Sequence, residues 1–250
     1  MTTTSDATTT TGRTTTTEAG RPVGPGAAGS TAEPSRADRA TREEILYCCR
    51  ESVRAGLNFN TQGNISVRLP GAHDGADAIV ITPSDVRYDA MGVDDMVVVG
   101  LDGTLLEGDL LPSTELPVHL EHYRRRPDVQ AIVHTESTFV NVLGALGRRI
   151  DPVLLNMVLY ARGPVEVMPF EFSTNADFGR RSAELMGDDV DAVVWGNHGL
   201  LAVGSSLRLA FKVAVAVEEN AEVLLRASAA GTPRVLVYED IDVPEGARLP

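Results

Sequence analysis

The sequence is poor in cysteine and has no long apolar run. Its only two cysteines, Cys48 and Cys49, are adjacent, so they form neither a disulfide framework nor a CxxC metal pair. They are therefore expected to be helix residues in a reducing compartment. A basic segment followed by an apolar run is missing, and so is an apolar stretch of membrane-spanning length. The sequence thus predicts a cytoplasmic protein that is neither secreted nor inserted in a membrane.

Positive charge is also scarce. The chain of 250 residues has 22 Lys and Arg against 35 Asp and Glu, which gives a formal net charge of −13. Such a balance argues against nucleic acid or an anionic membrane as a general partner, because both carry negative charge. The expected partner is a small-molecule substrate.

Composition divides the chain into a tail and one domain. Residues 1–38 are rich in Thr, Ser, Gly, Pro and Ala, and they have too few large apolar side chains to offset the entropy of ordering. We expect a disordered tail there and an ordered region that begins near Thr41. Residues 39–232 are predicted to form a single domain, and residues 233–250 a C-terminal extension.

Hydrophobic spacing within this domain predicts strands flanked by helices. A helix is expected from Thr41 to a stop at Gly56, and another over residues 112–126, opened by Ser113 or Thr114. Two further helices follow, over residues 137–147 and 207–230. Strands are expected near residues 60–69, 77–85 and 129–136, as a hairpin around Asp102–Gly103, and as two strands within residues 191–204. This order favours a three-layer α/β or α+β fold.

Three residues have the chemistry of metal ligands. His134 and Glu136 stand two apart at the end of a predicted strand, where alternate side chains share a face. His198 lies in a turn between Gly196 and Gly199. Two histidines and a carboxylate form an accepted facial set for a divalent ion. The alternative is structural: His134 ends a strand, Glu136 caps a helix and His198 is a turn residue.

A second group lies on one predicted helix. Glu115, His119 and His122 are spaced at i, i+4 and i+7. An amphipathic helix explains that spacing as well as a metal site does, so both histidines are expected to serve packing or the surface. The glycines of TQGNIS and GNHG match neither the phosphate-binding loop that contains a Lys nor the GxGxxG pattern. Nucleotide binding is therefore weakly supported.

Four segments in order resemble the class II aldolase/adducin family, which includes aldolases of fuculose and rhamnulose phosphates. The segments are GLNFNTQGNISVRL, IVITPSDVRYDAM, LLPSTELPVHLEHYRRRPDVQAIVHTE and WGNHGLLAVG, and the likeness covers about residues 41–230. The resemblance implies a central, mostly antiparallel sheet between helical layers, and a tetramer with sites at subunit interfaces.

The resemblance also implies roles for single residues. Glu115 matches the family's catalytic acid/base, His134 and His198 match two metal ligands, and Glu136 stands where the family has another histidine. The residues that remain to bind an oxyanion of the substrate are Thr61, Gly63, Asn64, Ser84, Ser113 and Thr114.

Three departures bear on the substrate. Glu136 replaces a neutral imidazole by an anion, which lowers the charge of the metal site by one. Asp85 stands where the family's phosphate loop has a glycine, and its carboxylate would repel a phosphate dianion unless Arg87 nearby compensates. A tyrosine of the sugar-phosphate aldolases would fall near Leu155–Asn156, where only Tyr160 is close. These departures argue against a sugar phosphate.

The sequence therefore predicts a metal-dependent enzyme that cleaves a C–C bond next to a carbonyl of an oxo- or hydroxy-acid, as an aldolase or a decarboxylase does. The cofactor is one divalent ion, Zn²⁺ or Fe²⁺. The rival is a non-haem Fe(II) oxygenase that decarboxylates an aromatic α-keto acid oxidatively, as in a branch of aminocoumarin antibiotic biosynthesis that this family resembles. The least favoured alternative is a non-catalytic scaffold of the adducin kind.

Overall fold

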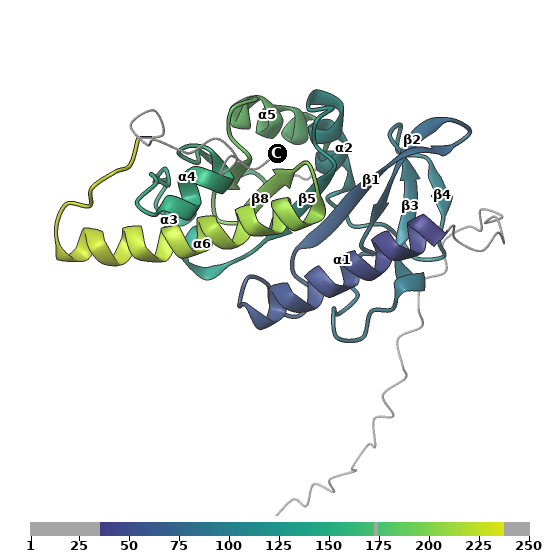
Figure 1. Cartoon of the computed structure of the whole chain (residues 1–250), viewed down its shortest axis with the longest axis horizontal. Helices are drawn as coiled ribbons and strands as arrows, with labels where there is room; N and C mark the ends of the chain where they lie inside the picture. Colours follow the sequence, from purple (N-terminus) through teal and green to yellow (C-terminus); the bar gives the residue numbers. More distant parts are fainter. Residues whose placement is uncertain (1–35, 173–174, 238–250) are drawn as a thin grey trace, which may run out of the picture.

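The computed structural model describes residues 36–172 and 175–237, which build one eight-stranded sheet with helices on both sides (Figure 1). The strands are β1 (Asn64–His73), β2 (Ala76–Ile81), β3 (Val97–Gly100), β4 (Leu105–Glu107), β5 (Ala131–Thr135), β6 (Val167–Met168), β7 (Ala192–Trp195) and β8 (Gly199–Gly204). The helices are α1 (Arg36–Arg54), α2 (Leu116–Arg125), α3 (Thr138–Ala145), α4 (Leu155–Ala161), α5 (Ala176–Met186) and α6 (Leu207–Ala230), with a 3₁₀ turn, η1 (Val93–Asp95).

The strand order brings distant parts of the chain together. The order is β4-β3-β2-β1-β5-β8-β7-β6, and all neighbours are antiparallel except β6 and β7. The central strands are therefore β1, β5 and β8. In their register Asn64 of β1 and Leu201 of β8 both pair with His134 of β5. Residues from three separate sequence segments thus meet at one end of the sheet.

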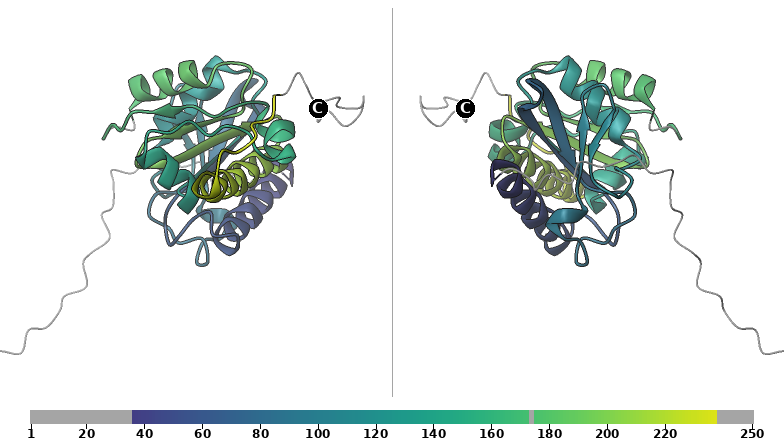
Figure 2. Two further views of the ribbon diagram at one scale, coloured as in Figure 1. Left: turned by 90° about the vertical axis from the view of Figure 1, so that its left-hand side faces the viewer. Right: turned by 90° about the vertical axis from the view of Figure 1, so that its right-hand side faces the viewer.

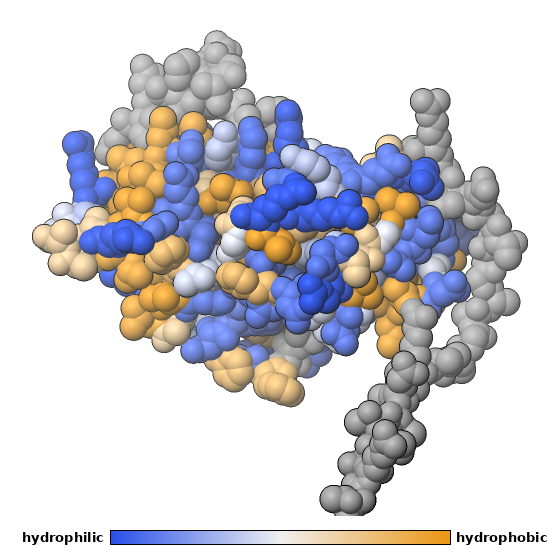
Figure 3. All heavy atoms as spheres, turned by 90° about the horizontal axis from the view of Figure 1, so that it is seen from below, coloured by the Kyte–Doolittle hydropathy of each residue, from blue (hydrophilic) through white to orange (hydrophobic). Residues whose placement is uncertain are grey.

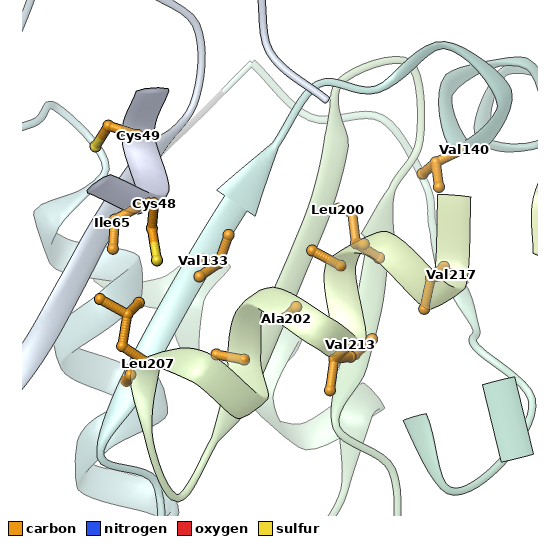
Figure 4. Close-up of a cluster of buried hydrophobic side chains, with 14 of the residues drawn as sticks. Cys48, Cys49, Ile65, Val133, Val140, Leu200, Ala202, Leu207, Val213 and Val217 are labelled. Carbon is orange, nitrogen blue, oxygen red and sulfur yellow. The ribbon is translucent and has the colours of Figure 1, made fainter. Parts of the chain in front are cut away.

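Each face of the sheet has its own hydrophobic core. One core joins the sheet to α1, α3, α4 and α6, and the other joins it to α2 and α5, so the molecule has three layers (Figure 2). The first core includes Ile65, Val133 and Leu200 of the sheet against Val213 and Val217 of α6 (Figure 4). Strand alternation then turns Ile132 toward α2 and α5, and His134, two residues on, shares that face.

The long helix and the hairpin follow from local sequence signals. α6 begins after Ser206, whose side chain accepts a hydrogen bond from the Leu209 N–H, as an N-cap does. The hairpin of β3 and β4 turns at Asp102–Gly103, where Gly103 has a φ of +93°. Both elements lie where the sequence predicts them, and the predicted three-layer α/β fold with a mostly antiparallel sheet is confirmed.

Some boundaries differ from the prediction. α1 begins at Arg36 rather than near Thr41, because the buried Asp38 carboxylate accepts a hydrogen bond from Arg42 Nε at 2.9 Å and ties the first turn to the domain. α2 has Glu115 as its N-cap residue instead of Ser113 or Thr114. The helices α4 and α5 and the strand β6 were not expected. Residues 1–35 of the predicted tail and 238–250 of the predicted extension lie outside the described residues.

Large exposed apolar side chains do not gather into one band on the face shown in Figure 3, where hydrophilic residues interrupt the hydrophobic ones. Phe170 and Phe172, in the segment between β6 and α5, are 58% and 98% exposed. Within the described residues, no helix combines the length and the apolar character needed to cross a bilayer.

Candidate metal centre

Glu115, His134 and His198 bring their ligand atoms together at the end of the sheet. Each side chain offers one such atom, and these atoms all lie within 4.8 Å of one another. His134 Nε2 lies 3.2 Å from Glu115 Oε2, and His198 Nε2 lies 3.1 Å from Glu115 Oε1. The carboxylate therefore stands between two imidazoles. Within the described chain this is the group that could hold a metal ion.

The two histidines are placed by the sheet and by a tight turn. His134 is the penultimate residue of β5, and the turn between β7 and β8 carries His198. Asn197 in that turn has a φ of +58°, a left-handed conformation that Asn tolerates better than most residues. A Cβ on Gly199 would lie 2.3 Å from the Thr135 carbonyl oxygen, so only glycine lets β8 approach β5 here.

Glu115 reaches the site from the start of α2. As the N-cap residue it lies at the positive end of the helix dipole, which favours an anion. Asn64 Nδ2 donates to Glu115 Oε2 at 2.7 Å, and the Glu115 N–H donates to Ser113 Oγ at 3.2 Å. The Glu115 residue is only 6% exposed, so this carboxylate is held in one place by neighbours rather than by water.

The group is electrostatically coupled. Burial acts to raise the pKa of Glu115, but His134, His198 and Asn64 outweigh it and lower the pKa to about 2. Burial lowers the pKa of His134, which the neighbouring Glu115 only partly opposes. For His198, burial is outweighed by the hydrogen bond and charge of Glu115, so its pKa is raised. At neutral pH Glu115 is therefore ionised and His134 is neutral.

The geometry fits a bound cation. The Leu200 carbonyl can only accept, so His134 Nδ1, at 2.9 Å from that oxygen, carries the ring hydrogen. His134 Nε2 then presents a lone pair toward an ionised carboxylate oxygen, and it has no hydrogen-bond donor. Two acceptors face each other at 3.2 Å in a buried place. A divalent ion between them would satisfy both, and imidazole nitrogen with carboxylate oxygen is a donor set that Zn²⁺ and Fe²⁺ accept.

Glu136 does not join this group. It follows the last residue of β5, its backbone N–H donates to Asn58 Oδ1 at 2.9 Å, and its side chain is half-buried. It still lies close enough to act on the pKa of both His134 and His198. The ligand role of Glu136 and the catalytic role of Glu115 stay predictions, and Glu115 is itself one of the three residues that could hold a metal ion.

The predicted substrate residues divide into two sets. Asn64 and Ser113 touch Glu115, as described above. Gly63 precedes Asn64 with a φ of +72°, and a Cβ there would lie 2.6 Å from the His134 carbonyl oxygen, so Gly63 shapes the backbone beside the site. Thr61, Ser84 and Thr114 make no hydrogen bond to Glu115, His134 or His198 among the described residues. Thr61 and Ser84 are half-buried, and Thr114 is exposed. The binding roles of all six stay predictions.

His119 and His122 lie outside the metal group, as expected, and both are fully buried. His119 Nδ1 is 2.7 Å from Ser66 Oγ, and His122 Nε2 is 3.1 Å from Ser182 Oγ. Burial lowers the pKa of each to about 3. They are therefore neutral packing residues of α2.

Sequence reasoning missed two residues beside the site. Asn58, fully buried in the loop after α1, accepts from the Glu136 N–H and donates to Ser52 Oγ at 3.2 Å. Trp195, the only tryptophan of the chain, has its ring centroid 4.7 Å from that of His134 and 5.3 Å from that of His198. Asn58 has no distinctive sequence signal, whereas Trp195 is three residues before His198 in the motif that was already singled out.

The predicted phosphate loop departs from a simple anion site. Asp85 is exposed and has a φ of +56°, a value that suits glycine. Arg87 pairs in bidentate fashion with Asp89, at 3.0 and 2.6 Å, rather than with Asp85. Tyr160 contacts Lys212, whose Nζ lies 5.1 Å from the ring centroid. The compensation that Arg87 could offer is thus directed elsewhere.

Comparison with known proteins places these features in a family. Residues 43–225 match the family described as Class II Aldolase and Adducin N-terminal domain. The chain is 32% identical to the 5-deoxy-D-ribulose 1-phosphate aldolase of Bacillus thuringiensis over 203 residues, 80% of this chain and 92% of that protein. It is also 32% identical to the 5-methylthioribulose-1-phosphate/5-deoxyribulose-1-phosphate aldolase of Rhodospirillum rubrum, over 81% of this chain and 88% of that one.

Solved structures agree with the sequence comparison. An L-fuculose 1-phosphate aldolase superposes with a TM-score of 0.74 at 29% identity, and the match covers 80% of this chain and 92% of that one.

Proposed function

Because the chain belongs to the class II aldolase and adducin family, we propose that it is a metal-dependent lyase that cleaves a C–C bond next to a carbonyl group. The observation that supports this proposal most directly is the buried group of Glu115, His134 and His198, in which a neutral imidazole nitrogen faces an ionised carboxylate. A protein that had kept the fold only as a scaffold would not need this arrangement, which is costly without a cation.

His134, His198 and Glu115 would hold the ion. His134 is oriented by the Leu200 carbonyl and Glu115 by Asn64, so two of the three donors are fixed before the ion arrives. The bound ion would supply Lewis-acid stabilisation for a substrate oxygen on which negative charge develops. Glu136 supplies a second carboxylate beside the group.

One of the two carboxylates, Glu115 or Glu136, is expected to accept a proton from the substrate. In aldol cleavage a hydroxyl of the substrate loses its proton and becomes a carbonyl as the C–C bond breaks. The electron pair of that bond passes to the neighbouring carbonyl group as an enolate, which then takes up a proton. An ionised carboxylate accepts the hydroxyl proton. We assign this step to whichever of Glu115 and Glu136 does not hold the ion. The contacts of Glu115 with both imidazoles favour it as the ligand, which leaves Glu136 as the proton acceptor. This reverses the roles that the resemblance implies.

Two substrate classes compete, and each is favoured by one observation. The relatives are named for cleaving 1-phosphates of deoxyribulose, methylthioribulose and fuculose, which favours a ketose 1-phosphate. Asp85 favours an oxo- or hydroxy-acid without phosphate, since an exposed carboxylate in the predicted phosphate loop repels a phosphate dianion. A direct comparison of turnover on both classes decides between them.

The decisive assay uses protein purified without added metal. Metal content is measured first, and cleavage of 5-deoxyribulose 1-phosphate and of an unphosphorylated hydroxy-oxo acid is then followed with and without O₂. Cleavage in the absence of O₂ that a chelator abolishes and Zn²⁺ restores supports the lyase. Full activity of the metal-free protein contradicts it.

The oxidative decarboxylase shares the same donors, two imidazoles and one carboxylate, and this arrangement alone favours it. It predicts strict dependence on O₂ and Fe²⁺, with inhibition by Zn²⁺ because Zn²⁺ cannot change its redox state. Assays on an aromatic α-keto acid in both atmospheres therefore separate the two reactions. Assembly into a tetramer stays a prediction, which light scattering on the purified protein tests.

The variant Asp85→Gly tests the role of the loop. Removing the carboxylate should lower the KM for the ketose 1-phosphate, while the KM for the unphosphorylated acid should not change. If both KM values stay the same, Asp85 does not face the substrate phosphate and the argument from this loop fails.

A further inference from the structure

Trp195 packs against both histidines of the metal group from the end of β7. Its ring is tilted by 32° to the ring of His134 and by 45° to that of His198. Trp195 is 1% exposed and His134 is also 1% exposed, so the contact between them is shielded from water. Since it occupies one side of both imidazoles, the indole limits the directions in which they can turn.

The indole is itself held by two helices. Trp195 Nε1 donates to Ser182 Oγ of α5 at 2.8 Å. The Ser182 hydroxyl, which accepts this hydrogen bond, can donate its own hydrogen to His122 Nε2 of α2 at 3.1 Å. Ser182 and His122 are both fully buried. A strand residue is thereby fixed to the layer of α2 and α5 by a continuous hydrogen-bonded chain.

The helices α2 and α5 pack closely against each other at this place. A Cβ on Gly179 of α5 would lie 2.8 Å from Val118 Cα of α2, so glycine permits the close packing of the two helices. The Phe178 ring also meets the Trp195 ring edge-on, with centroids 5.4 Å apart. The indole is therefore held both by its hydrogen bond to Ser182 and by its packing against Phe178.

A buried hydrogen-bonded chain of this kind needs a reason. His122 contributes one ring nitrogen to it and leaves Nδ1 without a hydrogen-bond partner in the described chain. A polar group with half of its capacity unused in a core has a free-energy cost, and an apolar residue would avoid that cost. The chain ends on the residue that contacts both candidate ligands, which is where its benefit lies.

We propose that Trp195, anchored through Ser182 to His122, is a positioning residue that holds the His134 and His198 imidazoles in the orientation that binds the metal ion. This proposal rests on the proposed function, because that function identifies the two histidines as ligands. The Leu200 carbonyl fixes the ring nitrogen of His134 from one direction, and Trp195 fixes the ring plane from another. Together they leave Nε2 directed at Glu115.

Trp195 also reports on its own role, since it supplies the only indole fluorescence of the chain. In chelator-treated protein, titration with Co²⁺ should quench its emission, because the ring lies beside both ligands.

Ser182→Ala removes the anchor and keeps the indole, and Trp195→Phe removes the indole hydrogen bond and keeps a ring. Both should weaken Zn²⁺ binding by about 10-fold or more in calorimetry with a competing chelator, as loss of groups that orient ligands does. His122→Gln keeps a polar atom near the Nε2 position and should retain more affinity than His122→Ala.

The matched control is Ser228→Ala in α6, where the hydroxyl donates to the Leu224 carbonyl and accepts from Arg148. It also removes two hydrogen bonds of a helical serine, but away from the site, and its Zn²⁺ affinity should equal that of the wild type. Emission of metal-free Ser182→Ala should differ from wild type, which a loss of stability alone would not cause in a folded sample. If wild-type protein binds no metal, the proposed function fails. If it binds metal and both Ser182→Ala and Trp195→Phe bind it equally well, the positioning role is overturned.

Discussion

Glu115 controls the charge of the site at the scale of single residues. Its carboxylate contacts His134, His198 and Asn64, and it sits at the start of a helix. Because Glu115 is ionised and His134 is neutral, an anionic carboxylate oxygen faces the lone pair of His134 Nε2. A cation bound there would gain imidazole nitrogens from His134 and His198 and a carboxylate oxygen from Glu115.

Sequence motifs singled out His134, His198, Glu115 and Glu136, but they could not say which of the two carboxylates lies between the imidazoles. His134 and His198 belong to strand ends and turns that motifs locate. The pairing of His134 with Glu136 relied on strand alternation, which requires the strand to continue, and β5 ends at Thr135. Which of two nearby carboxylates reaches the imidazoles is set by Asn64, Ser113 and the start of α2, and these contacts are tertiary.

The first prediction separates the two carboxylates. Glu115→Gln should lower Zn²⁺ affinity much more than Glu136→Gln, because it removes the charge that faces both imidazoles. Calorimetry on chelator-treated proteins measures both affinities. Activity should fall by about 10²–10⁴-fold for the variant that loses the proton acceptor, even when the ion is supplied in excess. If Glu136→Gln abolishes metal binding and Glu115→Gln preserves it, Glu136 is the ligand and Glu115 is the proton acceptor.

At the scale of elements, α2 connects the metal group to the core. Its N-terminus carries Glu115, and its buried face carries His119 and His122 next to Tyr123. Ser66 Oγ of β1 lies 2.7 Å from His119 Nδ1 and 2.8 Å from the Tyr123 hydroxyl. The helical spacing of these residues was visible in the sequence. The hydrogen bonds of His119 to Ser66 of β1 and of His122 to Ser182 of α5 show that both histidines lie in the core.

The second prediction concerns the acid stability of α2. Burial lowers the pKa of His119 and His122 to about 3, below the value of about 6.5 in an unfolded chain. The unfolded state therefore takes up a proton at each site as the pH falls below 6.5, while the folded state does not. The free energy of unfolding should fall by about 2 kcal/mol per histidine between pH 7 and pH 5.

Urea unfolding at the two pH values measures this effect on metal-free protein. His119→Gln should reduce the pH-dependent loss by one histidine's share, whatever its effect on stability at pH 7. Ser228→Ala in α6 offers the control, because it removes no titratable group and should leave the pH dependence unchanged. An undiminished loss in His119→Gln would show that this histidine is protonated in the folded state.

The third prediction concerns the contact between β5 and β8. Gly199→Ala would place a Cβ 2.3 Å from the Thr135 carbonyl oxygen and 2.9 Å from His134 Cε1, and backbone cannot yield as a flexible side chain can. We expect a loss of about 1–3 kcal/mol in the free energy of unfolding together with weaker Zn²⁺ binding. Gly231→Ala, whose Cβ would meet nothing within 4 Å, is the matched control and should leave both quantities unchanged.

At the scale of the whole molecule, the strand order is what assembles the site. β1 and β8 flank β5 although they are far from each other in sequence, so Asn64, His134 and the turn bearing His198 come to one end of the sheet. The order of elements in the sequence indicated three layers. It did not indicate β6, which is two residues long and has parallel pairing with β7, because such a short strand has no sequence period.

The fourth prediction concerns the link between metal binding and global stability. Every residue of the proposed centre lies in the described domain, and α1 is tied to that domain by the buried Arg42, whose guanidinium donates to Glu107 Oε1 at 2.7 Å and to the Met96 carbonyl at 2.9 Å. A chain that begins at Arg36 should therefore fold and bind Zn²⁺ as the full chain does. Free Zn²⁺ at 100 times its Kd should raise the free energy of unfolding of both chains by about 2.7 kcal/mol, since the ion binds the folded state. Urea unfolding with a buffered Zn²⁺ concentration measures this increment, and His134→Ala should abolish it in both lengths. A normal increment in the full chain together with none in the shorter one would show that residues 1–35 contribute to the metal centre, which would contradict the domain boundary proposed from composition.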